Sequence, residues 1–84
     1  MFNVKMTTIV NGHPVTHDPG TDIITDSPQP THVCQQHIVT VLNMCAVTKG
    51  VTVSNDGTVT FYPMHVVDRI DFELLEEEVP NVHD

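Results

Sequence analysis

The stretch that most constrains the fold runs from Val51 to Leu75 in an 84-residue chain. Alternating β-branched residues lead into Asn55-Asp56-Gly57, and the alternation continues beyond it over residues 58–62. An Asp-Gly pair supplies the positive φ angles that a tight hairpin needs. After Pro63, a third alternating run extends from residue 65 to Leu75. The pattern predicts two or three consecutive antiparallel strands.

A second hairpin is predicted near the N-terminus, over residues 4–17. Its first strand places four side chains on one face: Val4, Met6, Thr8 and Val10. Asn11-Gly12 is a two-residue turn signal, and Pro14 confines the returning strand to a sheet edge. Residues 18–31 contain three prolines and a glycine, which exclude a long regular element.

Residues 32–47 are compatible with two structures. A helix is favoured by apolar side chains at helical spacing, namely Cys34, Ile38, Val41, Leu42 and Cys45. Thr31 would then cap the helix and Gly50 would follow its end. The run of β-branched residues at 38–41 disfavours a helix and favours a strand, with Lys49-Gly50 as a turn. We prefer the strand, and the helix stays open as the alternative.

These elements predict a mainly β fold, either a small antiparallel sheet or a bent barrel of about five short strands. The alternative is an α+β fold with one helix at about 32–48 packed on a β-sheet. Residues 38–72 carry short strands, a tight turn and a final Val-Val-Asp-Arg-Ile-Asp-Phe return. In this they resemble small barrels of the Sm or SH3 type. The resemblance implies a fold only, because Sm-type proteins bind RNA through basic and aromatic surfaces that this sequence lacks.

The charge balance is strongly acidic. Eleven acidic residues stand against Lys5, Lys49 and Arg69, which leaves a formal net charge of −8. Binding to nucleic acid or to an anionic membrane surface needs Lys and Arg to meet phosphates, so neither is predicted. An acidic surface instead suits a basic protein partner.

The length of the chain predicts a single domain over residues 1–84. The acidic residues and the proline near its end predict a frayed tail at 76–84. No stretch approaches the length of a membrane span, and the N-terminus lacks the apolar run of a signal peptide. Two cysteines do not make a disulfide framework. We therefore expect a cytoplasmic protein.

The cluster of zinc-ligand types comprises His32, Cys34, His37 and Cys45. On a helix Cys45 would lie about 16 Å from Cys34 along the axis. On a strand His37 would point away from His32 and Cys34. Neither geometry closes a four-ligand site, so we predict no metal and no cofactor. The serines lie in turn-like sequences without a nucleophile motif, so we predict no enzymatic activity.

Two surfaces are candidates for partner binding. Around Pro63, an aromatic residue, a methionine and a histidine have the composition of an interface: Tyr62, Met64 and His65. The following run carries acids, of which Asp71 and Glu73 would share one face of a strand: Asp68, Asp71, Glu73, Glu76 and Glu77. The alternatives are a plain corner between strands and a solvated face that discourages aggregation.

We interpret the chain as a small acidic protein-interaction module without catalytic activity. It would dock on a basic surface of a host protein, as a phage-encoded accessory protein or inhibitor does. One alternative is a metal-binding or redox module that uses Cys34, Cys45 and the nearby histidines. Another is a self-assembling structural protein that forms homo-oligomers through exposed strands.

Overall fold

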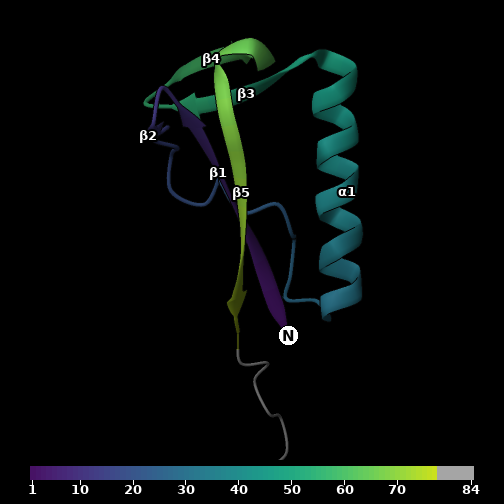
Figure 1. The fold of residues 1–84 in the computed structure, drawn as a ribbon. Coiled ribbons are helices and arrows are strands. Elements are labelled where there is room, and N and C mark those ends of the chain that lie inside the picture. The colour runs from purple at the N-terminus through teal and green to yellow at the C-terminus, as the bar shows by residue number, and fades with distance from the viewer. Residues whose placement is uncertain (78–84) are drawn as a thin grey trace, which may run out of the picture.

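A computed structural model describes residues 1–77 of the chain (Figure 1). The elements follow in the order β1 (Phe2–Val10), β2 (His13–Pro14), α1 (Thr31–Thr48), β3 (Gly50–Asn55), β4 (Thr58–Pro63), the 3-10 helix η1 (Met64–Val66) and β5 (Val67–Glu76). The strands form two antiparallel sheets, with strand orders β2-β1-β5 and β3-β4. Within residues 1–77 they do not close into a barrel. The fold is therefore mainly β, as predicted, with small antiparallel sheets in place of a barrel, and one helix packs on them as in the α+β alternative.

Both predicted hairpin turns are confirmed. Asn11 and Gly12 have φ angles of 53° and 77°, and they join Val10 to its cross-strand partner His13. Asp56 and Gly57 have φ angles of 51° and 76° in the turn between β3 and β4. Two successive positive φ angles match the right-handed twist of the flanking strands, which is why these turns form locally.

β1 is the central strand, and neighbouring backbone covers both of its edges. β5 pairs along one edge from Phe2 opposite Glu76 to Val10 opposite Val67, with a bulge near the Val10 end. On the other edge β2 pairs with the C-terminal end of β1, and residues 22–29 run beside its N-terminal half. Phe2 and Gln29 each donate their N–H to the other's carbonyl oxygen at 2.8 Å. The proline-rich segment is thus anchored to β1 without forming a long element.

The strand that we preferred for residues 32–47 is wrong, because α1 occupies residues 31–48. Helical spacing turns Cys34 and Cys45 to the same side, where both are buried against the sheet. As a strand, this segment would have had apolar side chains on both faces. A domain of this size can bury only one of the two faces, so the other would have stayed exposed. Packing of one helical face therefore outweighs the helix-propensity cost of the β-branched residues, a few tenths of a kcal/mol each.

The ends of α1 also differ from the prediction. Pro30, not Thr31, precedes the first turn, and no side chain caps it. Lys49, not Gly50, adopts the left-handed conformation, with φ 60°, and its N–H donates to the Cys45 carbonyl oxygen. Gly50 begins β3 instead, where a Cβ atom would collide with the ring of Phe61. Gly50 thus permits close packing of β4 on β3. It does not have the predicted role of terminating α1.

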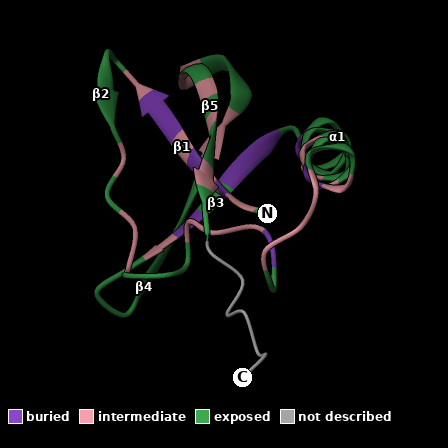
Figure 2. Ribbon diagram, turned by 90° about the horizontal axis from the view of Figure 1, so that it is seen from below, coloured by how far each residue is buried: buried purple, intermediate pink, exposed green. Residues whose placement is uncertain are grey.

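The core lies where β1, β3 and α1 meet. Met6, Cys45, Val51 and Val53 form its buried cluster. Partly buried side chains surround it, namely Val15, Ile24, Val41, Tyr62, Val67, Ile70 and Phe72. Figure 2 shows buried positions along β1 and β3, whereas α1 is exposed around most of its circumference. The core is therefore thin, as expected for a chain of this length.

The C-terminal strand is longer than predicted. Glu76, where the tail was expected to begin, pairs with Phe2, and the N–H of Glu77 donates to the Met1 carbonyl oxygen at 2.9 Å. Residues 78–84, the rest of the predicted tail, lie outside the described part of the chain. None of the helices found over residues 1–77 has the length and apolarity needed to cross a membrane.

Candidate functional site

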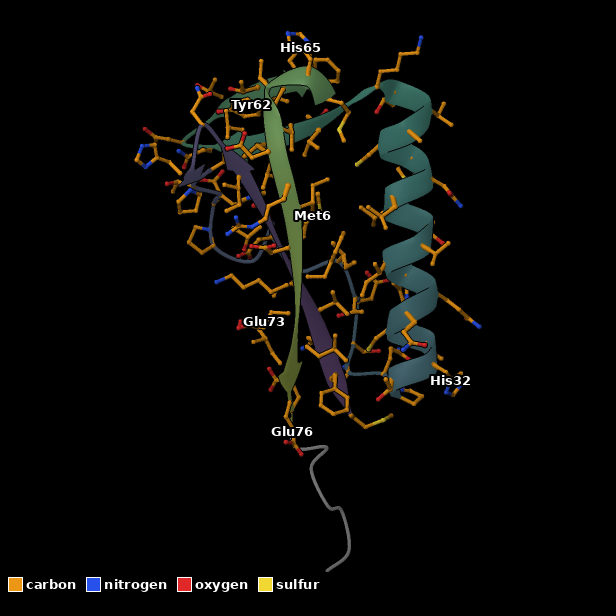
Figure 3. The ribbon with its side chains drawn as sticks, viewed as in Figure 1. Met6, His32, Tyr62, His65, Glu73 and Glu76 are labelled. Carbon is orange, nitrogen blue, oxygen red and sulfur yellow. The ribbon has the colours of Figure 1, made fainter. Side chains whose placement is uncertain are left out.

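The predicted partner-binding residues divide into two groups at opposite ends of β5 (Figure 3). Tyr62, His65 and Asp68 lie at the β4–β5 corner, whereas Glu73 and Glu76 lie toward the other end of the strand. An extended strand rises about 3.4 Å per residue, so about 27 Å separate Asp68 from Glu76. Asp71 and Glu73 lie between these two residues, so the acids are spread along the strand and do not form one compact cluster.

The corner is built into the scaffold on one side and exposed on the other. The Tyr62 side chain is partly buried and packs against the core cluster. The N–H of Met64 donates to the Lys49 carbonyl oxygen at 3.0 Å, which ties η1 to the end of α1. Met64 and His65 are exposed. Tyr62 thus positions the corner, and the other two side chains are available to a partner.

Asp68 has a structural role that the sequence does not signal. It lies in the bulge of β5, between Val67 opposite Val10 and Arg69 opposite Ile9. One carboxylate oxygen, Oδ2, accepts a hydrogen bond from the Gly12 N–H at 2.6 Å, across 56 positions in sequence. A bulge re-aims a side chain, and here it directs a carboxylate at the β1–β2 turn. No local pattern signals such a contact.

The remaining acids of β5 are partly balanced by cations. Arg69 Nε lies 3.2 Å from both carboxylate oxygens of Asp71. Both side chains are exposed, so the pair stabilises the fold by less than about 1 kcal/mol. Glu73 stands directly opposite Lys5, whose Nζ lies 3.9 Å from a carboxylate oxygen of Asp22. Because Lys5 is paired with Asp22 and not with Glu73, the uncompensated charge lies at Glu73, Glu76 and Glu77.

β5 is the outer strand of its sheet over the part of the chain that the structure describes. The strand order β2-β1-β5 leaves one edge of β5 without a neighbouring strand. None of its ten residues is buried. The predicted alternation holds over residues 69–73, where Ile70 and Phe72 pack toward the core while Arg69, Asp71 and Glu73 are exposed. It is wrong at the ends of the strand, because Val67 packs against the core and Leu74 is exposed. An outer strand presents unpaired N–H and C=O groups, so this edge has the capacity to pair with another extended segment.

The cysteines and histidines do not converge. Cys34 and Cys45 are free thiols, buried at separate places along α1. Burial raises the pKa of the Cys45 thiol above its ordinary value. Across residues 1–77, no three side chains of His, Cys, Asp or Glu come together as a metal site. The two thiols lie eleven positions apart along the helix, about 16 Å along its axis.

A hollow of about 570 Å³ lies between the β2 region and the β3–β4 hairpin. Its lining residues include His13, Thr58, Thr60 and Tyr62. Side chains of these types can hydrogen-bond small polar molecules, but the hollow is wide and open to solvent. The sequence does not signal this hollow, because His13 and Thr60 come together only through the arrangement of the two sheets.

The outward side of α1 is another exposed surface that the sequence analysis passed over. It presents Val39, Met44 and Val47 to solvent. A signal was available in the sequence, since residues 31–48 contain no Asp, Glu, Lys or Arg.

Comparisons of the chain with models of protein families, with curated proteins and with solved structures found no match.

Proposed function

We propose that this protein is a non-catalytic interaction module that binds a basic segment of a partner protein along the open edge of β5. The observation that carries the proposal is the position of β5, a ten-residue outer strand with no buried residue and with exposed carboxylates toward one end. An extended segment that adds to such an edge gains main-chain hydrogen bonds. Its alternate side chains then provide specificity.

The charges of the strand define the partner's chemistry. A bound segment with Lys or Arg at alternate positions would place cations beside Asp71 and Glu73, on the solvent face of β5. Opposite charges at neighbouring positions across a strand pair contribute roughly 0.2–1 kcal/mol each. The net charge of −8 would also steer a basic partner toward the protein before contact. Affinity should therefore fall as salt screens these charges.

The inhibitor interpretation follows from the same chemistry. Surfaces rich in Lys and Arg are those that bind nucleic acid and other anions. An acidic strand that occupies such a surface would compete with its anionic ligand. Docking on a basic surface of a host protein, with inhibition as the outcome, is the form of the proposal that we favour. The corner residues Met64 and His65 lie too far from Glu76 to share a short segment and would contact a larger partner separately.

A defined probe tests this mode of binding. A peptide of about ten residues that alternates Lys and Thr has the length of β5 and presents cations on one side. We expect it to bind at low salt and to dissociate as salt rises from about 50 to 500 mM. Binding would also slow amide hydrogen exchange in β5. Failure to bind at low salt, or binding that leaves the exchange of β5 unchanged, would overturn the proposal.

A matched pair of variants locates the binding surface. Glu73→Gln with Glu76→Gln removes two carboxylates from β5, whereas Asp26→Asn with Asp56→Asn removes two exposed carboxylates elsewhere. Both variants lose two negative charges. We expect the first to weaken peptide binding about five- to tenfold and the second less than about twofold, since exposed charge pairs each contribute up to about 1 kcal/mol. Equal weakening would mean that general acidity, and not β5, attracts the peptide.

A further inference from the structure

Alternate residues of β5 direct their backbone groups to its open edge, and the hydrogen bonds of β1 identify them. On β1, the bonds to segments other than β5 come from even-numbered residues, namely Phe2, Val4, Met6 and Thr8. Successive residues of a strand bond to opposite sides, so the odd-numbered residues of β1 bond to β5. The register sets them opposite residues 69, 71, 73 and 75. Within residues 1–77, the backbone groups at the open edge therefore belong to Ile70, Phe72, Leu74 and Glu76.

The same alternation decides which side chains an added strand would meet. Residues directly opposite one another in an antiparallel pair place their side chains on the same face of the sheet. On one face the added strand would lie beside Ile70 and Phe72, which pack against the core, and beside Leu74, which is 36% exposed. On the other face it would lie beside Asp71 and Glu73, which are both exposed. One face of the edge is thus apolar and the other is acidic.

We infer that the segment bound at β5 alternates basic and apolar residues, with the apolar ones on the apolar face of the edge. This pattern rests on the proposed function and specifies the residues that stand between the cations. Antiparallel pairing is the more stable arrangement per residue. Read from the position opposite Glu76 to the position opposite Ile70, the segment would then be Lys-Thr-Val-Lys-Val-Lys-Val. Lys stands opposite Glu73 and Glu76, whose charges are uncompensated and which lie along the same half of β5 (Figure 3).

Apolar residues fit the intervening positions because an apolar row already crosses the sheet. On β1, Val4 and Met6 are buried, and they stand directly opposite Leu74 and Phe72. The outer flank of that row lies at the open edge, where Leu74 is still exposed. Val at the facing positions of a bound segment would cover this flank, and burial of apolar surface is favourable. Thr at the same positions would set a hydroxyl group against apolar neighbours.

Three peptides with the same charge separate this pattern from general attraction. The first contains Lys-Thr-Val-Lys-Val-Lys-Val, and the second replaces each Val by Thr. The third has the residues of the first in the order Lys-Lys-Lys-Thr-Val-Val-Val, which no longer alternates. Apolar pairs across the two strands should make the first peptide bind about tenfold more tightly than the second at about 50 mM salt. The third should bind no more tightly than the second. Isothermal titration calorimetry measures all three affinities.

The outcomes distinguish this pattern from the proposed function on which it rests. Equal affinity of the first and second peptides would overturn the alternation of basic and apolar residues and leave binding at β5 intact. A third peptide that binds as tightly as the first would also overturn it, because charge and apolarity would then act without strand pairing. If none of the peptides binds, both proposals fail.

Hydrogen exchange of single amides, followed by NMR, tests which residues face the open edge. In the free protein, the amides of Phe72 and Leu74 should exchange faster than those of Asp71 and Glu73, which bond to β1. Binding of the first peptide should slow exchange at Phe72 and Leu74 and change it little at Asp71 and Glu73. Slowing confined to Asp71 and Glu73, or to residues outside β5, would contradict the inference.

A matched pair of substitutions locates the apolar contact. Leu74→Thr removes an apolar side chain from the edge, and Val59→Thr makes a similar change on β4, where Val59 is 68% exposed. We expect Leu74→Thr to reduce the preference for the first peptide over the second about threefold or more, and Val59→Thr to leave that preference intact. Circular dichroism checks that both variants fold. A preference that is unchanged in Leu74→Thr, or reduced equally in both variants, would show that the apolar face of β5 does not select the segment.

Discussion

The two exposed surfaces of this protein, the outward face of α1 and the open edge of β5, differ in what they offer a partner. α1 pairs the backbone groups of its interior within the helix and presents side chains without formal charge. Within residues 1–77, β5 has one edge without a neighbouring strand, and it presents carboxylates. Contact with α1 must therefore rest on apolar burial, which salt does not weaken. Contact with β5 combines main-chain pairing with charge, which salt screens.

The difference also reflects what each element requires to remain stable. Charges on an outer strand discourage unspecific pairing, so part of the acidity of β5 has a protective role. A helix has no such liability, because its backbone is already paired. Uncharged exposed residues on α1 are therefore not explained by the needs of the fold. Three predictions test the difference between the buried and the exposed side of α1 and the roles of the acidic residues of β5.

The largest effect should distinguish the two sides of α1. Cys45→Asp would bury an unpaired carboxylate in the core cluster, and we expect a loss of about 3 kcal/mol or more in the free energy of unfolding. Val47→Asp, two residues away on the exposed side, should cost less than about 1 kcal/mol. Urea unfolding at low protein concentration measures both. Similar losses would contradict the assignment of inward and outward faces.

A smaller effect should separate the acids of β5 into scaffold and surface. Asp68→Ala removes the acceptor for the Gly12 N–H, and we expect a loss of about 1–2 kcal/mol. For a domain of this size, such a loss lowers Tm by roughly 4–15 °C. Asp71→Ala removes only an exposed partner of Arg69, so the change should stay within about 0.5 kcal/mol. Thermal denaturation followed by circular dichroism compares them, and equal Tm values would contradict a structural role for Asp68.

The smallest effect concerns pH and the buried thiol. Burial raises the pKa of Cys45 above its ordinary value of 9.0, so the folded state holds this proton more tightly than the unfolded state. The resulting stabilisation is fully present below the ordinary pKa and is lost as pH rises through the raised one. We expect urea midpoints to fall between pH 8 and pH 10, and the fall to be shallower in Cys45→Ala. An identical slope in the variant would show that other groups cause it.

The two turns and the strand alternation were predictable because they are local. Asn11-Gly12 and Asp56-Gly57 adopt positive φ angles whatever surrounds them, and the two faces of β5 follow from a period of two. The candidate site was predictable only as a set of residue types. Its division into a corner and an acidic end arises because β5 is extended, and the contact of Asp68 with Gly12 depends on a bulge.

The amino-acid sequence by itself determined the hairpins, the acidic balance and the absence of charge between residues 31 and 48. The tertiary structure decided that this uncharged segment is a helix. Its apolar positions fit both a period of 3.6 and a period of two, and its β-branched residues favoured the strand. Burial of Cys34 and Cys45 on a single face resolved the ambiguity, because a thin sheet covers one side of a helix and leaves the other exposed.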